Sequence, residues 1–195
     1  KNAKVILLSE YLYYDIEKYI PENRVYYCPN GISDIDMIRN TEESSHKTDN
    51  ANERKMVEIL FLSNLIETKG VFVLLDACKI LQQKDLPFHC TFVGGAGDVS
   101  SMQLKERVKE LGLNEHIIYA GKKFGVEKLD VFSKANLFVH PTYNDCFPLV
   151  LLEAMQHNLP VVSTFEGGIP DIVEDGKTGF LVPKKDATAL AEKLE

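Results

Sequence analysis

The chain has 195 residues, enough for one large domain or for one domain with part of another. Its composition, 45% hydrophobic and 26% charged, is typical of a folded globular protein and excludes a disordered one. The net charge of −7 argues against a nucleic-acid partner, because binding the phosphate backbone needs a basic surface. No apolar run approaches the roughly 18 residues needed to span a bilayer.

The cysteines and histidines show no metal-site or disulfide pattern. The four cysteines (Cys28, Cys78, Cys90 and Cys146) include no CxxC pair, and the five histidines lack ligand spacing. Since Cys78 and Cys90 lie in apolar runs, we interpret the cysteines as buried, reduced thiols of a cytoplasmic protein. The chain lacks an initiator Met and ends within an expected helix, so we expect both ends to be boundaries within a longer protein.

The first part of the chain reads as a small piece followed by a linker. Strands are predicted over residues 4–9 and 24–28, with a Tyr-rich helix over 10–19 between them. Pro29-Asn30-Gly31 is a turn signal, and residues 41–55, TEESSHKTDNANERK, are polar and almost free of apolar residues. We therefore expect an N-terminal piece at 1–31, a linker at 32–55 and a main domain at 56–195.

From residue 57 onward, short apolar strands alternate with helices. Strands are predicted at 57–62, 88–93, 117–120, 137–140 and 180–182, with another that opens at 161–162, and helices at 71–81, 101–111, 126–133, 149–156 and 187–194. This alternation predicts βαβ units, and the continuously apolar strands indicate a parallel sheet covered on both faces. Right-handed crossovers make it a doubly wound α/β fold, which binds ligands outside the carboxyl ends of its strands.

The loop after the first main strand, residues 63–70 (SNLIETKG), places Lys69 at a helix entrance. A cation is unfavourable there because the helix dipole favours anions. An anionic ligand, held by the ammonium and by free N–H groups, would compensate. The alternative is a solvated surface lysine.

The loop after the second main strand, residues 94–98 (GGAGD), is glycine-rich, and Gly94 and Gly95 would let a ligand approach the backbone closely. The dinucleotide fingerprint is incomplete, because Ser100 occupies its third glycine position. The next strand also ends in Ala-Gly-Lys at 120–122, without the acidic residue that grips a ribose. A simple glycine-rich turn remains an alternative.

The loop and helix at residues 144–154 (NDCFPLVLLEA) carry two carboxylates. Pro148 suits the first helical position, and Glu153 follows in a helix that is apolar nearly all round, which predicts burial. A buried carboxylate needs a partner, either an internal donor or a ligand with paired hydroxyls such as a ribose diol. Asp145 can also be a turn or capping residue.

Together these segments resemble the C-terminal, Rossmann-like domain of a GT-B-fold retaining glycosyltransferase of family 4, the glycogen-synthase-like group. The resemblance covers essentially the whole chain. Its segments are PNGI at 29–32, FLSNLIETKG at 61–70, FVGGAGD at 92–98 and HPTYNDCFPLVLLEAMQHNLPVVSTFEGGIPDIVEDGKTGFLVP at 140–183. The last segment is highly specific, whereas the others are weak in isolation.

The resemblance implies roles for individual residues. Lys69 would hold the donor diphosphate, Asp145 would lie beside the transferred sugar, and these two are the expected catalytic residues. Glu153 would bind the ribose hydroxyls. The other expected donor-binding positions are in the glycine loop, at the helix start and in the loop that passes the nucleobase: Asn64, Gly94, Gly95, Lys122, Lys123, Phe147, Pro148 and Leu149.

Three positions depart from the family pattern. Asn64 stands where most members carry an Arg that shares the diphosphate with the Lys, so the charge clamp is weaker or another residue assists. Asp145 replaces a Glu and is one methylene shorter. Pro148 replaces a Gly and removes one N–H donor.

The implied function is transfer of a sugar from a nucleoside-diphosphate donor (UDP-, GDP- or ADP-linked, UDP first) to an acceptor hydroxyl with retention. No cofactor and no bound metal are expected. The acceptor, a sugar or a lipid-linked sugar in polysaccharide biosynthesis, would bind a missing N-terminal domain, which could also attach a cytoplasmic protein to the inner membrane. This chain alone would bind the donor but turn over poorly. The alternatives are a nucleotide-sugar epimerase of GT-B fold and a non-catalytic nucleotide-sugar-binding module.

Overall fold

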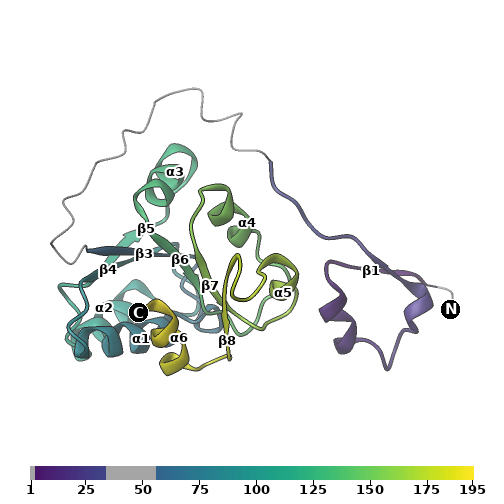
Figure 1. Cartoon of the computed structure of the whole chain (residues 1–195), viewed down its shortest axis with the longest axis horizontal. Coiled ribbons are helices and arrows are strands. Elements are labelled where there is room, and N and C mark those ends of the chain that lie inside the picture. Colours follow the sequence, from purple (N-terminus) through teal and green to yellow (C-terminus); the bar gives the residue numbers. More distant parts are fainter. Residues whose placement is uncertain (1–2, 34–55) are drawn as a thin grey trace.

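The computed structural model describes residues 3–33 and 56–195, and its main part is a six-stranded parallel sheet in the order β5-β4-β3-β6-β7-β8 (Figure 1). Each neighbouring pair runs parallel. The strands are β3 (Val57–Leu62), β4 (Phe88–Val93), β5 (Ile117–Gly121), β6 (Leu137–His140), β7 (Val161–Thr164) and β8 (Gly179–Val182). The predicted doubly wound, Rossmann-like α/β fold is confirmed.

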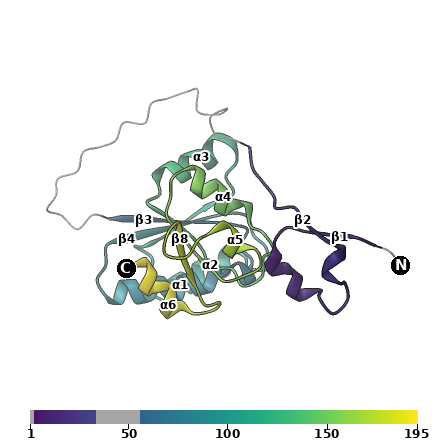
Figure 2. The same cartoon turned by 45° about the vertical axis from the view of Figure 1, so that its right-hand side comes forward.

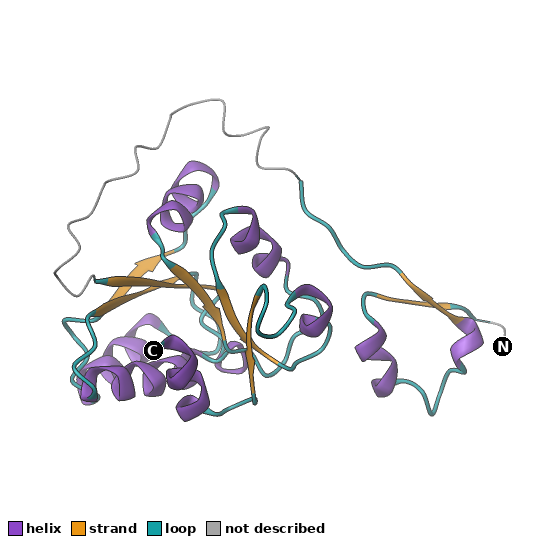
Figure 3. Cartoon of the chain, in the orientation of Figure 1, coloured by secondary structure: helices purple, strands orange, loops and turns teal. Residues whose placement is uncertain are grey.

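Helices cover both faces of this sheet (Figure 3). One face carries α1 (Val71–Gln83), α2 (Ser101–Glu110) and α6 (Ala187–Leu194), and the other carries α3 (Gly125–Lys134), α4 (Leu149–Gln156) and α5 (Ile169–Ile172). The period-2 alternation of a strand divides the core accordingly. Ile59 and Phe61 of β3 join the core under α1, and Leu60 joins the core that contains Phe132 of α3.

The predicted elements of the main domain agree closely with the structure, and the differences have local causes. Strand β7 opens at Val161-Val162 as predicted and runs to Thr164, because its polar residues are satisfied inside the fold. Ser163 Oγ donates to the carbonyl of His140 at 2.7 Å, and Thr164 Oγ1 donates to that of Thr142 at 2.5 Å. Helix α5 was not predicted, since it is only four residues long within a glycine-rich segment.

The N-terminal piece forms a separate two-stranded parallel sheet of β1 (Val5–Leu7) and β2 (Val25–Tyr27) (Figure 2). The helix predicted over 10–19 is wrong in type: a short 3-10 helix, η1 (Glu10–Asp15), takes its place. Another, η2 (Glu22–Arg24), precedes β2. No residue of η1 is buried, so packing of an apolar face does not stabilise a longer α-helix. The linker predicted at 32–55 lies outside the described residues from position 34 onward.

Burial tests the expectation for the cysteines. Cys78 and Cys90 are buried as predicted, whereas Cys28 and Cys146 are exposed, so the interpretation of all four as buried thiols is wrong. Within the described residues, no helix has the length and apolar character needed to cross a membrane.

Candidate active site

The loops after β3 and β4 are joined at the carboxyl edge of the sheet. Leu65 N donates to the carbonyl of Gly95 at 2.7 Å, and Gly97 N donates to that of Leu65 at 3.1 Å. Gly94 has φ +151°, and a Cβ there would lie 1.8 Å from the Ser63 carbonyl oxygen. Only glycine fits where these two backbones cross, so the glycine loop and the loop of Lys69 form one surface.

The segment after β6 fixes the loop of Lys69 from the other side. The Thr68 carbonyl accepts from Tyr143 N at 2.8 Å and from Thr142 Oγ1 at 3.1 Å. Gly70, with φ +83°, packs so closely that a Cβ would lie 2.1 Å from the Pro141 carbonyl oxygen. The carboxyl ends of β3, β4 and β6 therefore bring the three predicted loops together.

Lys69 is the last residue of the 3-10 helix η4 (Glu67–Lys69) and precedes Gly70, the N-cap of α1. Its Nζ lies 2.6 Å from Asp145 Oδ2 and 3.1 Å from the carbonyl oxygen of Asn144. Both side chains of the ion pair are largely buried, with 22% of Lys69 and 16% of Asp145 exposed. Lys69 is therefore not a solvated surface lysine, and Asp145 compensates its charge.

His140, at the end of β6, completes this cluster and was not predicted. Its Nε2 lies 3.3 Å from Asp145 Oδ2. Burial lowers the pKa of His140, and Lys69 lowers it further, against the opposing effect of Asp145. Burial raises the pKa of the Asp145 carboxyl, but hydrogen bonds from His140 and Lys69 outweigh it and leave that pKa below its ordinary value. At neutral pH the cluster therefore contains a neutral imidazole, a carboxylate and an ammonium. In the sequence, His140 could have been noticed as a polar residue at the end of an otherwise apolar strand.

A pocket of about 360 Å³ opens at the same edge of the sheet. Three lysines and the glycine loop line it, which concentrates positive charge in a protein of net charge −7. Its lining includes the predicted Asn64, Gly94, Gly95, Lys122 and Lys123 together with Phe124 and Lys128, which were not predicted. This is the environment expected of an anion-binding site.

Asn64 has a structural task in this pocket. Its Oδ1 accepts from the backbone N–H of Gly95 at 3.2 Å, which fixes the glycine loop. Gly95 in turn gives room to Lys122, since a Cβ at Gly95 would lie 2.0 Å from Lys122 Cε. Lys123, which precedes α3, has its Nζ 3.0 Å from Oε1 of Glu127 in the first turn of that helix. The cationic lining thus comes from the loop after β5 and from α3.

Glu153 is not buried as predicted, because only Leu151 and Ala154 of α4 are buried and 29% of the Glu153 side chain is exposed. An apolar composition on all sides was therefore a misleading sign of burial. Its partner is Lys128 of α3, whose Nζ lies 2.6 Å from Glu153 Oε1. Of the two partners considered from the sequence, the structure contains the internal donor. Because Lys128 also lines the pocket, the Glu153 carboxylate is connected to it.

Helix α4 has its predicted bounds, but Pro148 is not the first helical residue that the sequence suggested. Pro148 is the N-cap, with φ −73° and ψ 106°, and the helix begins at Leu149. Phe147 is buried and Leu149 is 37% exposed. Gly167 packs against this segment, since a Cβ at Gly167 would lie 2.1 Å from the Asp145 carbonyl oxygen. The N–H of Gly168 donates to the carbonyl oxygen of Cys146 at 2.7 Å. Contacts with Gly167 and Gly168 thus fix the backbone at Asp145 and Cys146, just before α4.

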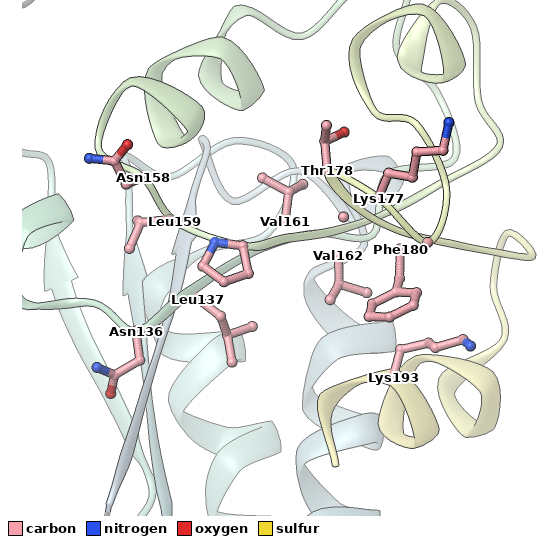
Figure 4. Close-up of a pocket in the computed structure, with 13 residues that line it drawn as sticks. Asn136, Leu137, Asn158, Leu159, Val161, Val162, Lys177, Thr178, Phe180 and Lys193 are labelled. Carbon is pink, nitrogen blue, oxygen red and sulfur yellow. The ribbon is translucent and has the colours of Figure 1, made fainter.

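A larger pocket, of about 550 Å³, lies at the opposite edge of the sheet, at the amino ends of β6, β7 and β8 (Figure 4). Leu137, Val162 and Phe180 form an apolar wall, and Lys193 lies over the Phe180 ring at 4.7 Å from its centroid. None of the predicted site residues lines it. Because doubly wound sheets bind ligands at the carboxyl ends of their strands, we assign the candidate site to the smaller pocket.

The chain is similar to known sugar-transferring enzymes. It is 32% identical over 145 residues to the putative colanic acid biosynthesis glycosyltransferase WcaL of Escherichia coli K12, covering 71% of this chain and 35% of WcaL. It superposes on a glycosyltransferase of Rickettsia africae with a TM-score of 0.82 at 20% identity, covering 99% of this chain and 52% of the other. Anabaena HepE, solved in complex with UDP and glucose, gives a TM-score of 0.73 at 24% identity, covering 97% and 52% of the two chains.

The chain thus spans about a third of the length of WcaL and about half of the two solved chains. The two structural likenesses concern the fold. The family model described as glycosyl transferases group 1 matches residues 41–195, which is well over half of the sequence. The protein therefore belongs to the group 1 glycosyl transferase family.

Proposed function

We propose that this chain binds the nucleoside-diphosphate sugar donor of a retaining, family 4 glycosyltransferase of GT-B architecture. The observation that carries the proposal is the joining of three loops, which places the Lys69–Asp145 ion pair of 2.6 Å at the same sheet edge as the lysine-lined pocket. The UDP and glucose named for HepE support a UDP-linked sugar as the first donor to test, ahead of GDP- and ADP-linked sugars.

Lys69 would stabilise the departing diphosphate. An ammonium has three N–H donors, and those of Lys69 reach Asp145 Oδ2 and the Asn144 carbonyl oxygen. One donor is left for a phosphate oxygen. A preorganised cation in a partly buried site stabilises charge that develops as the leaving group departs, at little reorganisation cost.

The second cation would come from α3 and the loop before it. Asn64 carries no charge and its Oδ1 is engaged by Gly95 N. Lys122, Lys123 and Lys128 line the pocket that Asn64 also lines, and they would share the diphosphate with Lys69. Glu153 would accept from the ribose hydroxyls, with Lys128 as its partner before the ligand binds.

The remaining parts of the reaction lie outside this chain in our proposal. Residues 56–195 form the donor-binding domain, and residues 1–31 belong to a crossover from an acceptor-binding domain that supplies the acceptor hydroxyl. The chain alone would then bind donor without efficient turnover. The relationship to a putative colanic acid enzyme supports a sugar acceptor in polysaccharide synthesis.

The test is calorimetric titration of the chain with UDP, GDP and ADP, together with Lys69→Ala. We expect one nucleotide to bind and Lys69→Ala to weaken it about 10- to 100-fold, since a charge-assisted hydrogen bond contributes roughly 1.5–3 kcal/mol. Lys134→Ala is the matched control, because Lys134 forms an ion pair of the same 2.6 Å length on the exposed side of α3. Folded wild-type protein that binds none of the three nucleotides would refute the proposal.

A further inference from the structure

We propose that His140 is a positioning residue for the donor sugar: its Nε2–H holds Asp145 so that Asp145 Oδ1 stays available to a sugar hydroxyl while Oδ2 holds Lys69. The inference rests on the proposed function. It adds a residue from a strand to a site otherwise built from loops and helices.

The packing around His140 fixes the ring without using its second nitrogen. The residue is 1% exposed, and its ring stacks with Phe61 and Phe138 at centroid distances of 6.4 Å each. Its Nδ1 is buried and has no hydrogen-bond partner among the described residues. An unpaired buried nitrogen is unfavourable, and a phenyl ring would avoid that penalty. What the imidazole adds at this position is the bond from Nε2 to Asp145.

The charge state of the ring decides the direction of that bond. His140 faces one carboxylate, Asp145, and one ammonium, Lys69, and burial keeps its pKa below the ordinary value. In the neutral ring only one nitrogen carries a proton. A proton on Nδ1 would turn the Nε2 lone pair toward the carboxylate, which is repulsive. The Nε2–H tautomer donates to Asp145 Oδ2 and is the form that fits the geometry.

The carboxylate of Asp145 is shared unevenly. Its Oδ2 accepts from both Lys69 and His140, at 2.6 and 3.3 Å, whereas Oδ1 has no hydrogen bond in the described part of the chain. A bound diphosphate would take up the remaining N–H donor of Lys69, while the other two stay on Asp145 Oδ2 and the Asn144 carbonyl oxygen. The Nε2–H of His140 fixes the orientation of the carboxylate that presents Oδ1, so its contribution should appear when a sugar is present and not with the bare nucleotide.

Two substitutions separate this role from simple core packing. His140→Phe keeps an aromatic ring between Phe61 and Phe138 but removes the donor, and His140→Gln keeps an amide N–H that can reach the position of Nε2. Calorimetry with UDP and UDP-glucose, and with the corresponding GDP–mannose and ADP–glucose pairs, gives the preference for the sugar nucleotide over the bare nucleotide. We expect His140→Phe to reduce that preference roughly tenfold, about one charge-assisted hydrogen bond, and His140→Gln to restore most of it.

The outcomes distinguish the two proposals. Wild-type protein that binds no nucleotide refutes the proposed function and the role of His140 with it. Nucleotide binding with an unchanged sugar preference in His140→Phe refutes the role of His140 alone, as does equal behaviour of the Phe and Gln variants.

A ligand-free measurement decides the question even where His140→Phe does not fold. Nitrogen-15 NMR of the imidazole ring distinguishes the two neutral tautomers and the imidazolium. We expect the neutral Nε2–H tautomer in wild-type protein at pH 7, with a changed Nε2 resonance in Asp145→Asn. An Nδ1–H tautomer or an imidazolium at pH 7 would overturn the inference.

Discussion

Lys128 Nζ lies 2.6 Å from Glu153 Oε1, so an ion pair between α3 and α4 connects the lining of the lysine-rich pocket to the carboxylate proposed for the ribose. Both side chains are between a quarter and a third exposed. The pair is therefore accessible to exchange partners with a ligand, and its own contribution to the stability of the fold is small.

Glu153→Gln should separate ligand binding from stability. An amide offers one acceptor oxygen, so the variant should lose discrimination between UDP and 2′-deoxy-UDP, which the wild type should show. The free energy of unfolding should change by less than about 1 kcal/mol, because the ion pair is partly exposed. Titration with both nucleotides and urea unfolding provide the measurements. Equal treatment of the two nucleotides by the wild type would show that Glu153 does not bind the ribose.

Asn64→Arg should strengthen nucleoside-diphosphate binding at low salt by adding a cation to the pocket. The gain should shrink as the ionic strength rises, because exposed charges are screened. The substitution also removes the acceptor of the Gly95 N–H, so a modest loss of stability should accompany it. Asn114→Arg, which adds the same charge before β5 at the opposite edge of the sheet, is the control. If both variants gain equally, the effect is one of net charge.

Gly94 and Gly95 should respond differently to alanine. At Gly94 the new Cβ would meet the Ser63 carbonyl oxygen at 1.8 Å with φ +151°, so Gly94→Ala should destabilise the fold by more than about 1 kcal/mol. At Gly95 the obstacle is Cε of the flexible Lys122 side chain, which can move away. Gly95→Ala should therefore fold normally and bind UDP more weakly. Chemical unfolding and calorimetry report the two effects, and unchanged binding by Gly95→Ala would argue against a role for Lys122.

The stability of the protein should rise with pH through the range in which an unfolded histidine loses its proton. Burial depresses the pKa of His140 in the folded state, so below about pH 6.5 the unfolded chain binds a proton there that the folded chain does not. This stabilisation is present above the unfolded pKa and is lost as the pH falls below it. His140→Gln should remove up to about one proton from the slope of unfolding free energy against pH between pH 5 and 7.

Urea unfolding at a series of pH values measures that slope for the wild type and the variant. The comparison isolates His140, since the other four histidines are present in both proteins. Parallel curves would mean that the His140 pKa is not depressed in the folded state.

Local patterns were enough to predict most of the fold. The bounds of β3, β4, β6, α4 and α6 follow from apolar periodicity and turn residues, because these act over a few neighbouring positions. The three loops of the candidate site were predictable for a related reason. In an alternating α/β chain, the loops that follow the parallel strands all lie at one edge of the sheet.

The sequence by itself thus determined the parallel sheet, the edge at which the candidate site lies, and the presence of Lys69 and Asp145 in the loops there. Only the tertiary structure decided their partners. Asp145 lies 76 positions from Lys69 and Lys128 lies 25 positions from Glu153, so neither pair is set by local geometry. The exposure of Glu153 likewise depends on which neighbouring elements cover α4. Side-chain pairing and burial arise from contacts between elements distant in sequence, and hydrophobic periodicity carries no information about them.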